Sequence, residues 1–184
     1  MDEIAQLAGL LKARNIIDAQ ISKLISRPAL MGHVGEYIAT RTFDICLGES
    51  AAHKAIDGYL RSGPLAGRSV NIKWYARQEG LLDITPEALP DYYLVLTGPL
   101  SPINSSRGIN RPCSINHVYL FNASELVDRL RARGVAIGVA TCVQKALWDT
   151  AEIYPSQNNV LLAVSDEARD LLVLFGAERL SAER

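Results

Sequence analysis

The stretch AIDGYLRSGPLAGRSVNIKWYA, residues 55–76, predicts a β-hairpin. Residues 55–60 and 68–76 have strand character, and the glycines and proline between them are typical of a hairpin loop. In VNIKW, apolar side chains alternate with Asn71 and Lys73, as in a strand whose successive side chains point to opposite faces. The amide and the ammonium group therefore share one face, which either meets water or forms the floor of a site.

A carboxylate in the first predicted strand belongs to the same surface. Residues directly opposite each other in an antiparallel hairpin share a face. A register that places Asp57 opposite Asn71 or opposite Lys73 brings all three onto one surface, whereas a slip of one residue separates them. The backbone carbonyl of Ile72 lies between Asn71 and Lys73. Glu36 reaches the same place if the helix that carries it packs across the hairpin.

The rest of the chain adds helices and strands on both sides of the hairpin. Apolar residues three and four apart predict a long helix over residues 2–26 and a second helix over about 30–43. Further strands are predicted at 91–98, 115–121 and 135–140, and further helices after the cap residue Asn122, over 142–154 and over 165–176. This order predicts a mixed sheet between helices, an α/β or α+β domain with an added N-terminal helix.

The N-terminal helix divides the chain into two parts, residues 1–27 and an α/β domain over residues 28–184. The helix is apolar on one side and polar on the other. It either packs on its own domain or pairs with a second copy in a homodimer, and spacing alone does not separate these alternatives.

Composition places the chain among ordinary globular proteins. It has 184 residues, 48% of them hydrophobic and 21% charged, with a net charge of −1 and a pI of about 6.3. A neutral chain is not a nucleic-acid coat, so a polyanion would have to bind a local patch. Three widely spaced cysteines argue against a disulfide framework or a structural zinc site, and we expect buried, reduced thiols. We find neither a signal peptide nor a membrane span and expect a cytoplasmic protein.

Four residues in order, Glu36 on a helix, Asp57 on a strand, and Asn71 and Lys73 on the next strand, resemble the PD-(D/E)XK nuclease superfamily. The resemblance covers residues 30–140 and implies the restriction-endonuclease-like fold. In that superfamily the carboxylates bind one or two Mg²⁺ (or Mn²⁺) ions, and the lysine orients or activates the attacking water. The chain departs from the pattern at Asn71, where an acid or glutamine is usual.

The resemblance implies roles for these residues. Asp57 and Glu36 are the expected metal ligands, with the Asn71 amide and the Ile72 carbonyl as weaker ones, because Mg²⁺ prefers oxygen ligands. Lys73 is the expected water-positioning residue. Asp57, Asn71, Lys73 and Glu36 together are the expected catalytic set for hydrolysis of phosphodiester bonds in DNA. Because Asn71 lacks a charge, the alternative is an inactive nucleic-acid-binding, regulatory or assembly protein on the same fold.

Four basic residues are expected to contact nucleic acid, namely Arg107, Arg111, Lys54 and Arg68. Paired arginines in a loop can clamp phosphates, although a solvated surface loop has the same composition.

Each site residue also has a purely structural interpretation. Asp57 followed by Gly58 is typical of a turn or bulge, Lys73 of an exposed strand face, and Glu36 of a solvated helix face.

Overall fold

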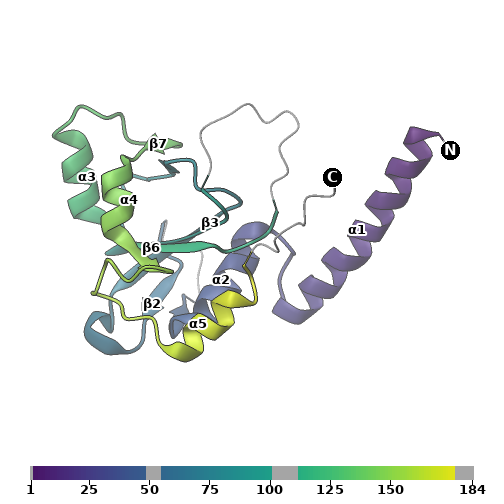
Figure 1. Ribbon diagram of the computed structural model, residues 1–184, viewed down its shortest axis with the longest axis horizontal. Helices are drawn as coiled ribbons and strands as arrows, with labels where there is room; N and C mark the ends of the chain where they lie inside the picture. The colour runs from purple at the N-terminus through teal and green to yellow at the C-terminus, as the bar shows by residue number, and fades with distance from the viewer. Residues whose placement is uncertain (1, 49–54, 101–111, 177–184) are drawn as a thin grey trace.

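The computed structural model describes residues 2–48, 55–100 and 112–176, which form a mixed sheet flanked by helices (Figure 1). The sheet has six strands in the order β1-β2-β3-β5-β6-β8. Its strands are β1 (Ile45–Leu47), β2 (Gly58–Leu60), β3 (Ser69–Tyr75), β5 (Tyr92–Thr97), β6 (His117–Asn122) and β8 (Glu152–Tyr154). β3 and β5 are parallel, and the other neighbouring pairs are antiparallel. This is the mixed α/β class that the sequence predicts.

Five helices and three short elements complete the described chain. The helices are α1 (Glu3–Ile25), α2 (Met31–Thr42), α3 (Ala123–Arg131), α4 (Lys145–Ala151) and α5 (Asp166–Val173). The short elements are the 3-10 turn η1 (Gly63–Leu65) and the two-stranded ribbon of β4 (Leu81–Leu82) and β7 (Thr141–Cys142).

Each face of the sheet has its own hydrophobic core. Figure 1 shows α3 and α4 on one side of the sheet and α2 and α5 on the other. Val70 and Ile72 of β3 pack into the core beneath α2 and α5, whereas Tyr93 and Val95 of β5 pack beneath α3 and α4. β5 is buried along its whole length, which confirms the prediction of a central strand.

The predicted hairpin is present, with Gly58 opposite Val70 and Tyr59 opposite Ser69. β2 begins at Gly58 rather than at residue 55, so it is shorter than the sequence suggests. A Cβ atom on Gly58 would lie 2.4 Å from the carbonyl oxygen of Cys46 on β1. Only glycine allows β1 and β2 to approach this closely, which explains the Asp-Gly pair in a strand.

α2 lies close against β3 at one point. A Cβ atom on Gly35 would lie 3.0 Å from the Cβ of Trp74, whereas a Cβ on Gly32 would meet nothing within 4 Å. The absence of a side chain at Gly35 therefore lets α2 sit directly on β3. This contact fixes the position of Glu36, the next residue of the helix.

Two predictions in the second half of the chain are wrong. Residues 135–140 form no strand: Ala140 is left-handed at φ 54°, and the Asp83 carboxylate accepts its N–H at 2.7 Å. The helix predicted over 142–154 ends at Ala151, and β8 follows it. Trp148 belongs to the core on one face of the sheet and Ile153 to the core on the other. Between them the chain joins the edge of the sheet as β8, whose pairing with β6 directs Ile153 to the other face, and a continuous helix cannot do so.

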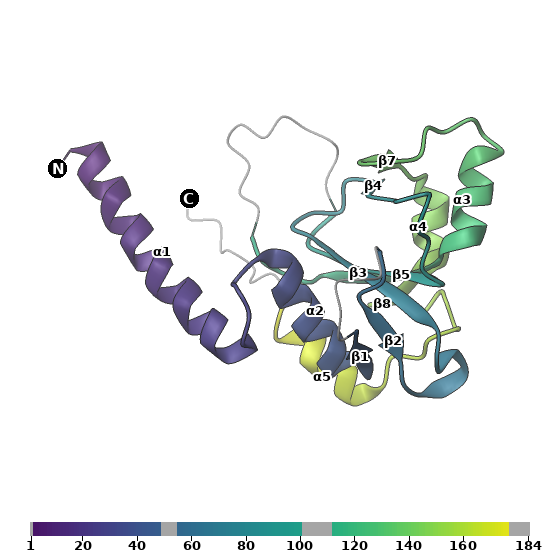
Figure 2. The ribbon, with the colours of Figure 1, turned by 180° about the vertical axis from the view of Figure 1, so that it is seen from behind.

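α1 confirms the predicted long helix and extends away from the body of the molecule in both views (Figures 1 and 2). Asp2 caps its first turn by accepting the Ile4 N–H at 3.2 Å, and Ser26 ends it in a left-handed conformation. None of the helices in the described ranges is long and apolar enough to cross a membrane.

The expectation of buried thiols is wrong. Cys46, Cys113 and Cys142 are all free and exposed.

Candidate functional site

Asp57 directly precedes β2, at the level where β3 continues beyond its pairing with β2. Its N–H donates to the carbonyl oxygen of Val70 at 2.9 Å, and its Oδ2 accepts the N–H of Ile72 at 2.6 Å. The carboxylate thus accepts the Ile72 N–H, which would otherwise donate to the backbone of a longer β2. The pairing of Gly58 with Val70 places Asp57 level with Asn71, one of the two registers that bring the predicted residues together.

Asn71 is buried without full hydrogen bonding. The residue is 5% exposed, and its Oδ1 has no hydrogen-bond partner among the residues that the structure describes. Buried polar atoms nearly always have a hydrogen-bond partner, and burying one without a partner costs about 1–3 kcal/mol of stability. Three other buried polar atoms of the described residues share this property, namely Tyr93 Oη, Thr97 Oγ1 and Trp148 Nε1. Asn71 differs from them in its place level with the Asp57 carboxylate, where a bound cation would supply the missing partner.

Lys73 follows on the same face of β3. In the parallel ladder it pairs with Val95, as Asn71 pairs with Tyr93, and its side chain is half-buried. Because side chains alternate along a strand, Asn71 and Lys73 share a face, as the sequence predicts.

Glu36 approaches from α2 and is held by an arginine. Its Oε2 accepts a hydrogen bond from Nη1 of Arg27 at 2.5 Å, and the side chain is 16% exposed. Glu36 is therefore not a solvated helix-face residue. Sequence spacing does not reveal this pair, because Arg27 lies between α1 and α2 and only the angle between these helices brings it to Glu36.

The charges of Glu36, Lys73 and Arg27 act on the Asp57 carboxyl, although α2 covers the face of β3 opposite to the one that carries Asn71 and Lys73. Burial raises the pKa of the Asp57 carboxyl above its ordinary value of 3.8, and the nearby charge of Glu36 raises it further. The Ile72 N–H and the charges of Lys73 and Arg27 act in the opposite direction but do not compensate. The hydrogen bond and the neighbouring cations thus offset only part of the cost of burying the Asp57 carboxylate.

All the candidate ligands of this site are oxygen atoms. The N–H and C=O groups of one strand residue point to the same edge, so the Ile72 carbonyl faces the edge that β2 leaves open. The Asp57 carboxylate, the Asn71 amide oxygen and the Ile72 carbonyl are donors suited to a hard cation such as Mg²⁺. The Glu36 carboxylate is held by Arg27 and would have to leave it to join them. Within the described ranges, no three His, Cys, Asp or Glu side chains are grouped to hold a metal. A cation here would therefore depend on Asn71 and Ile72.

The structure tests little of the predicted nucleic-acid contacts. Lys54, Arg107 and Arg111 lie outside the described residues. Arg68 precedes β3 and pairs with Asp91 at 3.2 Å, with 60% of its side chain exposed. It lies three residues before Asn71, about 10 Å along the strand.

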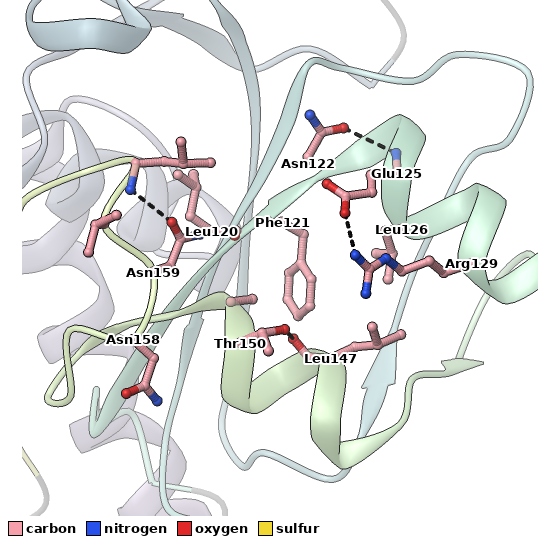
Figure 3. Close-up of a pocket in the computed structure, with 13 residues that line it drawn as sticks. Leu120, Phe121, Asn122, Glu125, Leu126, Arg129, Leu147, Thr150, Asn158 and Asn159 are labelled. Atoms are coloured by element: carbon pink, nitrogen blue, oxygen red, sulfur yellow. Dashed lines mark hydrogen bonds and ion pairs between the residues drawn. The ribbon is translucent and has the colours of Figure 1, made fainter.

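A separate hollow of about 310 Å³ lies between α3, α4 and residues 158–161 (Figure 3). Its floor is apolar and includes Phe121 and Leu126. Two polar residues at its rim are bonded to each other, since Arg129 donates to Glu125 at 2.6 Å. Unlike Asn71, these side chains are satisfied within the protein and indicate no ligand.

No protein-family model matches the chain, and no curated protein is significantly similar to it.

Proposed function

We propose that the chain is a metal-dependent nuclease of the PD-(D/E)XK type, with a restriction-endonuclease-like core, that hydrolyses phosphodiester bonds in DNA. The observation that carries the proposal is the unpartnered Oδ1 of buried Asn71 beside the desolvated carboxylate of Asp57. The amide oxygen lacks a partner and the burial of the carboxylate is only partly compensated, and a divalent cation would satisfy both groups.

The residues divide into those that hold the metal and one that acts on the reactants. Asp57, Glu36, the Asn71 amide and the Ile72 carbonyl would hold a Mg²⁺ ion, which polarises phosphate and lowers the pKa of bound water. Lys73 would place a positive charge beside the reacting phosphate and hold the attacking water. Arg27 neutralises Glu36 in the metal-free protein, so metal binding has to compete with this ion pair.

One observation favours a second candidate, an inactive DNA-binding or regulatory protein on the same core. Asn71 carries no charge, so the site has one carboxylate fewer than the usual pattern of the superfamily. Metal affinity falls with the number of charged ligands. A site that binds DNA without a metal would keep Lys73 and Arg27 but would not cleave.

Cleavage assays separate the two candidates. The protein is incubated with supercoiled plasmid, single-stranded DNA and RNA in the presence of Mg²⁺, Mn²⁺ or EDTA. Asp57→Asn and Lys73→Ala are the test variants, and Asp91→Asn is the matched control, because Asp91 also accepts a backbone N–H of β3 but lies outside the site.

The proposal predicts nicking of DNA that EDTA and both test variants abolish and that Asp91→Asn leaves intact. DNA binding without cleavage would favour the inactive candidate. Cleavage of RNA but not DNA would show that RNA, rather than DNA, is the substrate. Absence of both cleavage and binding would overturn the proposal.

A further inference from the structure

α1 exposes more aliphatic surface than a solitary helix in water is expected to keep. Ile4, Leu7, Leu10, Leu11, Ile17 and Leu24 are each between 50% and 72% exposed. Figures 1 and 2 show the helix extending away from the sheet and from the other helices, so the described body of the chain does not cover it. Ile25, at the foot of the helix, is its one buried residue.

The exposed residues follow a heptad repeat. Steps of three and four residues lead along one line of the helix through positions 4, 7, 11, 14, 18, 21 and 25. Leu10, Ile17 and Leu24 form a second line, seven residues apart, directly beside the first. An apolar stripe of this width, with period 3.5, is the pattern of a helix that packs against another helix. Ile16, by contrast, lies on the opposite side of α1.

Two charges interrupt the stripe at its centre. Arg14 and Asp18 occupy the line where the other five positions are isoleucine or leucine. Within one chain they form an ion pair at 3.5 Å, with 75% and 41% of their side chains exposed. An exposed pair of this kind contributes little to helix stability, so its place in the apolar line points to another role.

The order of these charges distinguishes the orientations of a helix pair. A parallel pair places each stripe residue beside its own copy, so Arg14 would face Arg14 and Asp18 would face Asp18. An antiparallel pair centred on residue 16 places Arg14 against Asp18 of the second copy, twice. The same register places Leu11 against Ile21 of the second copy. Polar residues inside such a seam commonly set register and orientation.

We propose that α1 binds α1 of a second copy of this chain as an antiparallel pair whose register is set by Arg14 and Asp18. The proposal does not depend on the nuclease function. The opposed helix dipoles favour this orientation.

The apolar area is sufficient for a reversible pair. Six aliphatic side chains of this exposure offer about 350–400 Å² per copy, at roughly 100 Å² for each fully exposed side chain. A standard interface buries about 800 Å² per partner, and somewhat more than half of it is apolar. The helix alone supplies most of this area, so we expect a dimer that dissociates on dilution.

The first experiment compares two variants of the full chain that carry the same change on opposite sides of α1. Leu11→Glu lies in the stripe and Ile16→Glu outside it, and the two parent residues are 50% and 62% exposed. Sedimentation across the micromolar range should show a dimer for the parent and for Ile16→Glu. The dissociation constant of the Leu11→Glu dimer should be at least about tenfold higher than that of the parent. At concentrations where the parent is monomeric, both variants should unfold at the parent's temperature, because neither side chain is buried in the monomer.

The second experiment determines the orientation. A variant with Arg14→Asp together with Asp18→Arg is mixed with the parent chain carrying a mass tag, and native mass spectrometry counts the mixed dimers. An antiparallel pair sorts into the two homodimers, because the mixed pair would oppose like charges. A parallel pair would form mixed dimers preferentially.

Three outcomes would overturn the proposal. They are a parent that stays monomeric throughout the concentration range, a Leu11→Glu variant that dimerises as well as Ile16→Glu, and preferential formation of mixed dimers.

Discussion

Two aspartates accept a backbone N–H from the same strand, yet their pKa values move in opposite directions. Asp91 Oδ2 accepts the N–H of Ser69 at 2.8 Å at the start of β3, and Asp57 Oδ2 accepts the N–H of Ile72 at 2.6 Å in its middle. The pKa of Asp91 lies below the ordinary value of 3.8, and that of Asp57 lies above it. The bond from a backbone N–H, which both aspartates accept, is therefore not what distinguishes the two regions.

The additional hydrogen bonds of Asp91 and the burial of Asp57 make the difference. Asp91 is partly exposed and also accepts the Ser69 hydroxyl at 2.7 Å and the Arg68 guanidinium. Asp57 is desolvated and lies near Glu36, with an orphaned amide oxygen beside it. The first arrangement is complete and stabilises the strand. The second leaves the burial of a carboxylate only partly compensated, and groups with perturbed pKa values of this kind cluster at functional sites.

The largest expected effect follows from Asp57→Asn, which keeps an acceptor for Ile72 but removes the charge. Cleavage should fall by at least about 100-fold, since even residues behind a metal ligand cost 10–100-fold. The free energy of unfolding at neutral pH should rise. A carboxyl with a raised folded-state pKa adds stability below the unfolded value of 3.8 and loses it as the pH rises through the folded value. Urea titrations at several pH values measure the difference.

The gain from Asp57→Asn should therefore grow with pH and vanish below the unfolded pKa. A variant that is less stable than the parent at neutral pH would show that Asp57 is already compensated, like Asp91.

Asn71→Asp sharpens the contrast by restoring the acid of the usual nuclease pattern. The metal-free variant should be less stable than the parent, because a third carboxylate joins Asp57 and Glu36. Affinity for Mg²⁺ should rise by about tenfold or more, since ligand charge tunes affinity. Titration calorimetry measures the affinity, with Asp91→Asn as a control that should bind Mg²⁺ as the parent does. Equal affinity in Asn71→Asp and parent would place the cation elsewhere.

The hairpin and the order of the candidate residues could be predicted from the sequence, because turn residues and the period of two are local signals. The burial of Asn71 could not, since it depends on what covers the sheet face that Asn71 shares with Tyr93 and Val95. The pairing of Arg27 with Glu36 could not either, since it depends on the angle between α1 and α2. The same limit explains the error at residues 142–154. Trp148 and Ile153 have suitable spacing for one helix, and only their assignment to opposite cores ends it at Ala151.

Removal of the other aspartate should affect stability alone. Asp91→Ala leaves the buried Ser69 N–H without its acceptor, which should cost about 1 kcal/mol at neutral pH after allowance for the partial exposure of the carboxylate. A lowered folded-state pKa gives stability above the unfolded value of 3.8 that is lost as the pH falls through the folded value. The gap to the parent should close in acid, the reverse of Asp57→Asn. Under conditions where the Asp91→Ala variant is fully folded, its rate of DNA cleavage should equal that of the parent.

The smallest expected effect concerns the helix that brings Glu36 to the site. Gly35→Ala would place a methyl group 3.0 Å from the Cβ of Trp74 and push α2 off β3, whereas Gly32→Ala enters open space. Gly32→Ala should stabilise the protein by about 0.5–1 kcal/mol through helix propensity. Gly35→Ala should lose that gain to overpacking of about 1 kcal/mol or more and should also weaken Mg²⁺ binding, because Glu36 moves with the helix. Thermal unfolding with and without Mg²⁺ separates the two effects. If both variants bind Mg²⁺ like the parent, Glu36 does not contribute to the metal site, and the difference between the two regions of β3 rests on Asp57 and Asn71 alone.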